Sequence, residues 1–180
     1  MIICITGMPG SGKSEAAKAF AEHGFAIEEM GDEVRRQAKL AINASDGPAV
    51  WEFAASLKAE NGMDVIAETI ASRIAVDSDT VISGLRNADE LGVFREKFGD
   101  QLIVLEIYAP LETRYTRILE RGRGYVLKDY AQFLERERNE LEGLGQTSVK
   151  DVAEHTIKNT DSIEDLKRSI HAFLALKKSK

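Results

Sequence analysis

A glycine-rich loop near the start of the chain constrains its fold more than any other feature. Residues 7–14 read GMPGSGKS and match the pattern G-x-x-x-x-G-K-[ST] at every fixed position. The loop follows a continuous apolar run, Ile2 to Thr6, which is typical of a strand buried on both faces of a parallel sheet. It precedes a stretch rich in Ala, Glu and Lys, Lys13 to Glu22, which favours a helix. The order strand, loop, helix is the context that this motif requires.

The residues of the loop are suited to binding phosphate. Glycines let the backbone wrap around a phosphate, and N–H groups at the positive end of the following helix bind its oxygens. Lys13 is expected to reach the β and γ phosphates as a catalytic residue, and Ser14 to coordinate the Mg²⁺ that bridges them. The sequence therefore predicts an ATP site, with Mg²⁺ as cofactor, formed by Gly7, Met8, Pro9, Gly10, Ser11, Gly12, Lys13 and Ser14. The loop alone does not separate a kinase from a switch or a motor.

Strand and helix patterns alternate along the rest of the chain. Strands are expected at 25–29, 80–83, 101–108 and 156–158, and helices over most of 32–76 and at 89–98, 111–120, 128–141 and from 163 onward. This alternation predicts a three-layer α/β fold with a mainly parallel sheet. No repeat, low-complexity tract or long linker divides the 180 residues, so we expect a single domain, 1–180.

Charge and composition argue against several classes of protein. A formal net charge of −6 disfavours a general nucleic-acid binder, because affinity for a phosphate backbone comes from clustered Lys and Arg. The apolar runs are too short for a membrane span or a secretion signal. Cys4 is the only cysteine, so no internal disulfide is possible. We expect a cytoplasmic protein that binds neither nucleic acid nor membrane.

Polar segments follow the second and third predicted strands, at the sheet edge where the loop also lies. Arg35 and Arg86 are the candidates for binding a second, anionic substrate, because the planar guanidinium fits a phosphate. Arg35 is favoured over Arg36, although both fit a solvated surface equally well. Asp32 is a candidate catalytic and acceptor-binding residue, and capping of a helix explains it as well.

Four arginines lie close together in this acidic chain: Arg114, Arg117, Arg121 and Arg123. A salt-bridged surface explains the first two better than a function does. Arg121 and Arg123 are candidate catalytic residues on a movable segment. Such a segment would close over the triphosphate, exclude water and stabilise the transferring group.

Two further sets of side chains are assigned no role. The alternating Arg and Glu residues of 135–142 fit a charged surface helix. The three histidines lie far apart without metal-ligand spacing, so no zinc site is expected.

Together these motifs resemble the adenylate-kinase-related P-loop kinases. They are most similar to an archaeal family of that type, which is itself similar to dephospho-coenzyme A kinase. The resemblance spans nearly the whole chain and rests on segments 6–15, 30–35 and 84–86 and on Ile157 with Asn159. It implies a P-loop NTPase fold like that of nucleoside monophosphate kinases, with a five-stranded parallel core, a helical acceptor-binding insert near 32–76 and a lid near 121–129.

The resemblance also bears on individual residues. In adenylate kinases, arginines at the positions of Arg35 and Arg86 hold the monophosphate acceptor. One departure is Ser83, where the archaeal family usually carries an aspartate. A carboxylate that would help to hold Mg²⁺ is therefore missing at the end of the third strand.

Three functions stay open. The first is ATP-dependent phosphotransfer to a nucleotide or nucleotide-like small molecule, with ATP and that acceptor as the partners. The second is transfer to a hydroxyl, as in dephospho-coenzyme A kinase, for which Asp32 is the candidate proton acceptor. The third is a non-catalytic adenine-nucleotide sensor or assembly module. Ser83 favours the third function, and the combination of Arg35, Arg86 and Arg121 favours an enzyme.

Overall fold

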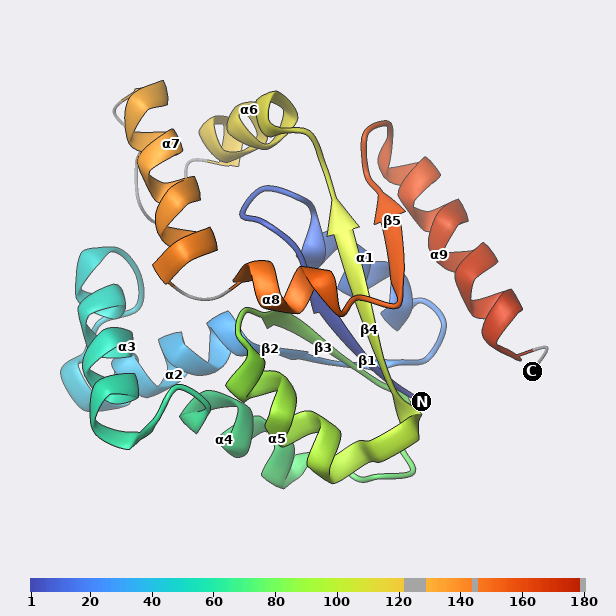
Figure 1. Ribbon diagram of the computed structural model, residues 1–180, viewed down its shortest axis with the longest axis horizontal. Helices are drawn as coiled ribbons and strands as arrows, with labels where there is room; N and C mark the ends of the chain where they lie inside the picture. Colours follow the sequence, from blue (N-terminus) through green and yellow to red (C-terminus); the bar gives the residue numbers. More distant parts are fainter. Residues whose placement is uncertain (122–128, 144–145, 179–180) are drawn as a thin grey trace.

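The computed structural model describes residues 1–121, 129–143 and 146–178. In this part of the chain a five-stranded sheet forms the centre of the molecule (Figure 1). Its strands are β1 (Ile2–Thr6), β2 (Ala26–Glu29), β3 (Thr80–Leu85), β4 (Leu102–Tyr108) and β5 (His155–Lys158). Every neighbouring pair is parallel, and the strand order is β2-β3-β1-β4-β5. The predicted parallel, five-stranded core is confirmed.

Helices connect the strands and cover the sheet. They are α1 (Lys13–Ala21), α2 (Met30–Ile42), α3 (Pro48–Asn61), α4 (Val65–Arg73), α5 (Ala88–Phe98), α6 (Leu111–Arg121), α7 (Tyr130–Arg138), α8 (Gln146–Asp151) and α9 (Ile163–Lys178). A 3₁₀ turn, η1 (Gly99–Gln101), precedes β4, and a π-helical turn, η2 (Asn139–Gly143), follows α7. Helix α8 was not predicted. In the described residues, no helix combines the length and the apolar character that crossing a membrane would require.

The central strand of the sheet is buried on both faces. All five residues of β1 are buried, and its side chains alternate between two apolar clusters. Ile2 and Cys4 belong to the cluster with α4 and α5, whereas Ile3 and Ile5 pack with α1 and α9. Because both faces are covered, the strand reads as a continuous apolar run and not as an alternation. The three-layer arrangement is thereby confirmed.

The strand order determines where a ligand is expected to bind. Strand β1 is central, with β3 on one side and β4 on the other. The chain leaves β1 toward β2 on one side of the sheet and reaches β4 on the other, so the order reverses at β1. In open parallel sheets, ligands bind outside the carboxyl ends of the strands at such a point. The glycine loop directly follows β1, and α6 and α7 lie at this same end of the sheet (Figure 1).

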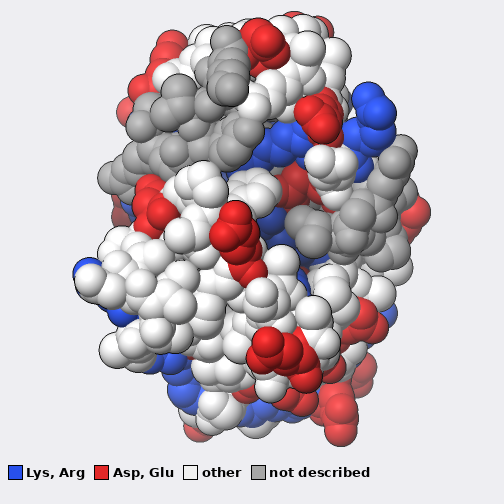
Figure 2. All heavy atoms as spheres, turned by 90° about the vertical axis from the view of Figure 1, so that its left-hand side faces the viewer, with Lys and Arg blue, Asp and Glu red and all other residues white. Residues whose placement is uncertain are grey.

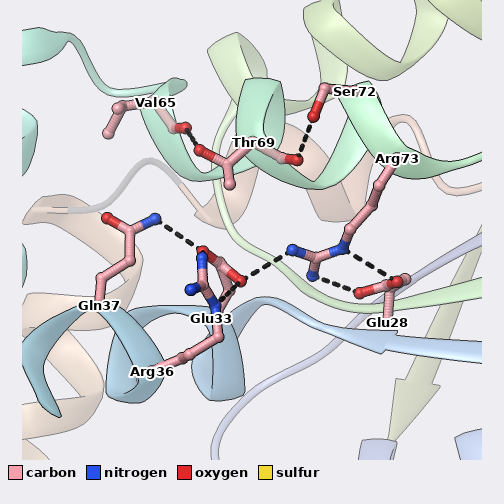
Figure 3. A network of polar contacts seen from close by, with 8 residues as sticks. All are labelled: Glu28, Glu33, Arg36, Gln37, Val65, Thr69, Ser72 and Arg73. Carbon is pink, nitrogen blue, oxygen red and sulfur yellow. Dashed lines mark hydrogen bonds and ion pairs between the residues drawn. The ribbon is translucent and has the colours of Figure 1, made fainter. Parts of the chain in front are cut away.

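A polar network joins helices α2 and α4 of the helical insert to the outermost strand, β2 (Figure 3). Glu33 of α2 is buried and accepts hydrogen bonds from Arg36 at 2.6 Å, Gln37 at 2.8 Å and Arg73 of α4 at 2.9 Å. Arg73 Nε also donates to Glu28 of β2 at 3.1 Å. These bonds, led by that from Arg36, lower the pKa of Glu33 from 4.5 to about 2. The network therefore stabilises the fold at neutral pH, and its contribution declines as the pH falls from 4.5 toward 2.

Candidate active site

The glycine loop has a backbone shape that other residues rarely adopt. Gly10 and Gly12 have φ angles of 80° and 99°, in the left-handed region. Their α-carbons also face close neighbours: a Cβ on Gly12 would lie 2.1 Å from Asn159 Nδ2, and one on Gly10 would lie 2.7 Å from the Arg114 carbonyl oxygen. The loop therefore packs directly against the start of α6 and the residue that follows β5.

Three side chains bind carbonyl oxygens of the loop. Lys13 Nζ donates to the oxygens of Gly7 and Met8 at 2.7 and 3.1 Å. Arg114 Nη1 donates to the oxygen of Pro9 at 3.3 Å. From beyond β5, Asn159 Nδ2 donates to the Ser11 oxygen at 2.8 Å. The loop is thus held by its own Lys13 and by side chains from two distant parts of the chain.

Lys13 lies in an environment that disfavours its charge. Burial first, and then the charge of Arg86, lower the pKa of Lys13 from 10.5 to about 7. Arg114 acts in the same direction, whereas Glu140 and Glu29 oppose it. These four charged side chains therefore gather around Lys13. A hollow on the face shown in Figure 2 holds basic and acidic side chains side by side.

Arg86 lies at the predicted sheet edge and has two well-defined supports. Its backbone N–H donates to Glu90 Oε2 at 2.9 Å, and Lys58 of α3 donates to the other oxygen of Glu90 at 2.8 Å. Its guanidinium Nη1 donates to both carboxylate oxygens of Glu140, at 3.0 Å each. The Arg86 side chain remains 38% exposed, so part of it faces solvent. Arg86 is thus coupled both to the helical insert and to the turn after α7.

The interpretation of Arg114 as a surface residue is wrong. Arg114 is 6% exposed, and its two terminal nitrogens bind the two oxygens of Glu137 at 2.5 Å each. Its Nε donates to the Ala109 carbonyl at 3.0 Å, and its guanidinium lies 5.9 Å from the centre of the Phe133 ring. The physical reason is that α7 packs over α6 and covers this face.

The helix with alternating Arg and Glu is likewise not a purely solvated surface helix. Glu137 and Glu140 are 7% and 3% exposed, although both lie in a strongly charged stretch. Tyr115 of α6 packs against Tyr130 and Phe133 of α7, with ring centres 4.9 and 5.2 Å apart. This aromatic contact turns the two glutamates inward, where they meet Arg114 and Arg86.

Two of the residues predicted to bind an acceptor pair with each other. Asp32 accepts a hydrogen bond from Arg35 Nε at 3.2 Å and a shorter one from the Arg35 terminal nitrogen; the Asp32 side chain is largely exposed and that of Arg35 is partly exposed. The sequence analysis did not identify Glu29, whose negative charge favours the protonated form of Lys13. Glu29 ends β2 and pairs in register with Ser83 of β3. Its place at the end of a strand was the signal that could have identified it.

The remaining predicted site residues lie at the periphery of the described region. Ser14 is half-buried in the first turn of α1. Arg121 is exposed and is the last residue of α6. Arg123 and most of the predicted lid, 121–129, lie outside the described residues.

Comparison with known proteins identifies the family. A family model described as an AAA domain matches residues 3–145. The UPF0200 protein PYRAB09750 of Pyrococcus abyssi is 34% identical over 180 residues, which cover 97% of this chain and 95% of that protein. This chain belongs to the UPF0200 family. Another member, TV0279 of Thermoplasma volcanium, is 37% identical over 164 residues and covers 91% of this chain and 90% of its own.

Solved structures show which fold this UPF0200 protein shares. A shikimate kinase from Acinetobacter baumannii in complex with shikimate superposes with a TM-score of 0.72 at 20% identity, over 99% of this chain and 95% of the kinase. A gluconokinase from Sinorhizobium meliloti 1021 gives a TM-score of 0.56 at 20% identity, over 96% and 90% of the two chains. The α/β fold of P-loop kinases is confirmed. The narrower relation to adenylate kinase and dephospho-coenzyme A kinase stays a prediction.

Proposed function

We propose that this protein is an ATP-dependent phosphotransferase acting on a small, nucleotide-like acceptor that binds beside Arg86. The observation that carries the proposal is the convergence on Lys13 of charges from the ends of β2 and β3, from α6 and from the turn after α7. A protein that only binds ATP needs the phosphate loop but has no need of a second, solvent-accessible arginine beside it. The fold shared with kinases of small molecules supports the same conclusion.

The chain has suitable residues for the donor side of the reaction. Lys13 would contact the β and γ phosphates, and Arg121 and Arg123 would close over them. Mg²⁺ is bound in such sites by one or two protein groups together with phosphates and water. The Ser14 hydroxyl, at the start of α1, fits this requirement. No group of three or more His, Cys, Asp or Glu side chains suited to a metal occurs among the described residues. When bound, Mg²⁺ would offset charge on the phosphates.

A specific observation weakens the alternative of a non-catalytic sensor. That alternative drew on Ser83, where a carboxylate was expected. Glu29 pairs with Ser83 in the β2–β3 register, and its charge raises the pKa of Lys13. A carboxylate is therefore available from the neighbouring strand. We propose that Glu29 takes the place of the missing acid near Mg²⁺.

A product screen tests the proposal. The protein is incubated with ATP, Mg²⁺ and one acceptor at a time from a panel of nucleoside monophosphates, dephospho-coenzyme A, shikimate and gluconate, and products are identified by mass spectrometry. We expect one acceptor class to gain a phosphoryl group in equal amount to the ADP formed. ATP binding without acceptor-dependent ADP across a broad panel would favour the sensor instead.

Two carboxylate variants then distinguish the proton acceptor from the residue that helps to hold Mg²⁺. With a hydroxyl acceptor, Asp32→Asn is expected to lower kcat about 100-fold if Asp32 receives the proton, and to change little with a monophosphate. Glu29→Gln is the matched variant, and its defect is expected to shrink as Mg²⁺ is raised. Full rescue of Asp32→Asn by excess Mg²⁺ would contradict its role as a base.

The lowered pKa of Lys13 predicts that ATP binding takes up a proton. Because its pKa is about 7, the free lysine loses its charge as the pH rises through 7 and is largely neutral at about one pH unit above that value. Phosphates favour the charged form and raise this pKa, so ATP affinity is expected to fall up to about tenfold for each pH unit above 7.

Calorimetry at pH 8 in buffers of different ionisation enthalpy measures the proton uptake directly. We expect close to one proton per ATP bound, and none in Lys13→Met. An ATP affinity that is independent of both pH and buffer would show that Lys13 is already charged in the free protein.

A further inference from the structure

The contact between Arg86 and Glu140 lies where the proposed acceptor would bind. Both carboxylate oxygens of Glu140 accept from one nitrogen of Arg86, at 3.0 Å each, and Glu140 is 3% exposed. Within the described residues, the other guanidinium nitrogens of Arg86 donate no hydrogen bond to a side chain. They are therefore left for a ligand, with a buried carboxylate fixed next to them.

The turn that carries Glu140 is locally unusual. Glu140 lies in η2, a π-helical turn, and π turns occur frequently at functional sites. One turn earlier, the two oxygens of Glu137 accept hydrogen bonds from the two terminal nitrogens of Arg114, at 2.5 Å each. Two buried glutamates on one continuous segment thus bind two arginines, and the charges of both arginines lower the pKa of Lys13.

The charged side chains around Lys13 leave no excess of positive charge. Arg86 and Arg114 stand with Glu29, Glu137 and Glu140, so these side chains are balanced when Lys13 is protonated and net negative when it is neutral. A site that binds a phosphate monoester needs an excess of positive charge, because the ligand carries close to two negative charges at neutral pH. A like charge fixed in the site repels such a ligand and excludes it. An acceptor hydroxyl, in contrast, donates a hydrogen bond to a carboxylate.

We propose that Glu140 is a specificity-determining residue of the acceptor site. It shares Arg86 with the acceptor and selects molecules that enter with a hydroxyl group and at most one negative charge, against phosphate monoesters. This inference rests on the proposed function and decides between its two acceptor classes. In the transfer, a bond forms between the hydroxyl oxygen and the γ phosphorus. The bond from that phosphorus to the β–γ bridging oxygen breaks, ADP leaves, and the hydroxyl proton passes to a carboxylate of the site.

Binding of AMP, used as a phosphate-monoester probe, tests the proposal without turnover. The phosphate loop is first saturated with Mg²⁺ and a non-hydrolysable ATP analogue, and AMP is then titrated by calorimetry. The wild-type protein is expected to bind AMP weakly, and Glu140→Gln at least about tenfold more tightly. The gain is expected to disappear in Arg86→Met/Glu140→Gln. Glu135→Gln removes the same charge from an exposed position of α7 and should behave as wild type.

Trp51 reports whether the variant remains folded around this segment. Arg136 of α7 lies 4.7 Å from the centre of the Trp51 ring, and this is the only tryptophan in the chain. Its emission is expected to be unchanged in Glu140→Gln if α7 remains against α3.

Each outcome of the titration has a defined meaning. Tight AMP binding by the wild-type protein beside the analogue would overturn the proposal without any variant being made. An unchanged AMP affinity in folded Glu140→Gln would also overturn it and would leave Glu140 as an anchor of η2 alone. Failure of the analogue itself to bind the wild-type protein would instead contradict the proposed function.

Discussion

Replacing Lys13 with methionine is expected to lower phosphotransfer about 1,000-fold while the protein stays folded. The loss is large because the ammonium is the group placed to stabilise charge that develops on the transferring phosphate. The fold should tolerate the change, since burial already works against the lysine charge and lowers its pKa to about 7. Steady-state ADP release measures the rate, and urea unfolding measures stability.

Lys18 provides a matched control for that variant. It lies on the same helix, and its side chain is 66% exposed and pairs with Glu15 at the surface. Lys18→Met is expected to keep wild-type turnover. If folded Lys13→Met kept wild-type turnover as well, the glycine loop would not be the site of the ATP chemistry.

Replacing Glu137 with alanine is expected to lower the free energy of unfolding by about 3 kcal/mol. The substitution leaves the Arg114 charge buried without its carboxylate, and breaking a buried pair in this way typically costs about 3–5 kcal/mol. We expect the lower end of that range, because the Ala109 and Pro9 carbonyls still accept hydrogen bonds from Arg114. A shift of the urea midpoint at constant slope is the measurement.

Two further variants separate this ion pair from general effects of mutation. Glu135→Ala, at an exposed position of the same helix, is expected to change the unfolding free energy by no more than about 0.5 kcal/mol. The double variant Arg114→Met/Glu137→Leu replaces both charges with apolar side chains and is expected to recover much of the loss. A Glu137→Ala protein as stable as wild type would show that the pair adds nothing to the fold.

The fold was predictable because, along most of the chain, the apolar pattern of each segment agrees with its place in the three-layer structure. Apolar runs such as Ile2 to Thr6 are explained by burial on both faces, and the helices between them separate parallel strands. Helix α8 was missed because its sequence, QTSVKD, offers a single apolar side chain, Val149, which is fully buried. One apolar residue gives no period from which a helix can be predicted.

The candidate site was predictable only where a residue type implies its role. The loop residues and Arg86 follow strands and could be placed at the sheet edge from the sequence. Glu137 and Glu140 could not, because alternating charges on a helix normally indicate a solvated face. Their burial depends on the packing of α7 over α6, which brings together residues far apart in the chain. Buried charge pairs of this kind are a tertiary property.

The hydrogen bonds from Asn159 and Arg114 to the glycine loop affect when its conformational entropy is lost. A free loop with three glycines would become ordered only as ATP bound, and this loss would weaken the affinity. Here Asn159 and Arg114 bind two of its carbonyls through hydrogen bonds that belong to the fold itself. Part of the ordering is therefore completed during folding. The loop is preorganised, and the free energy of its contacts with phosphate remains available for binding.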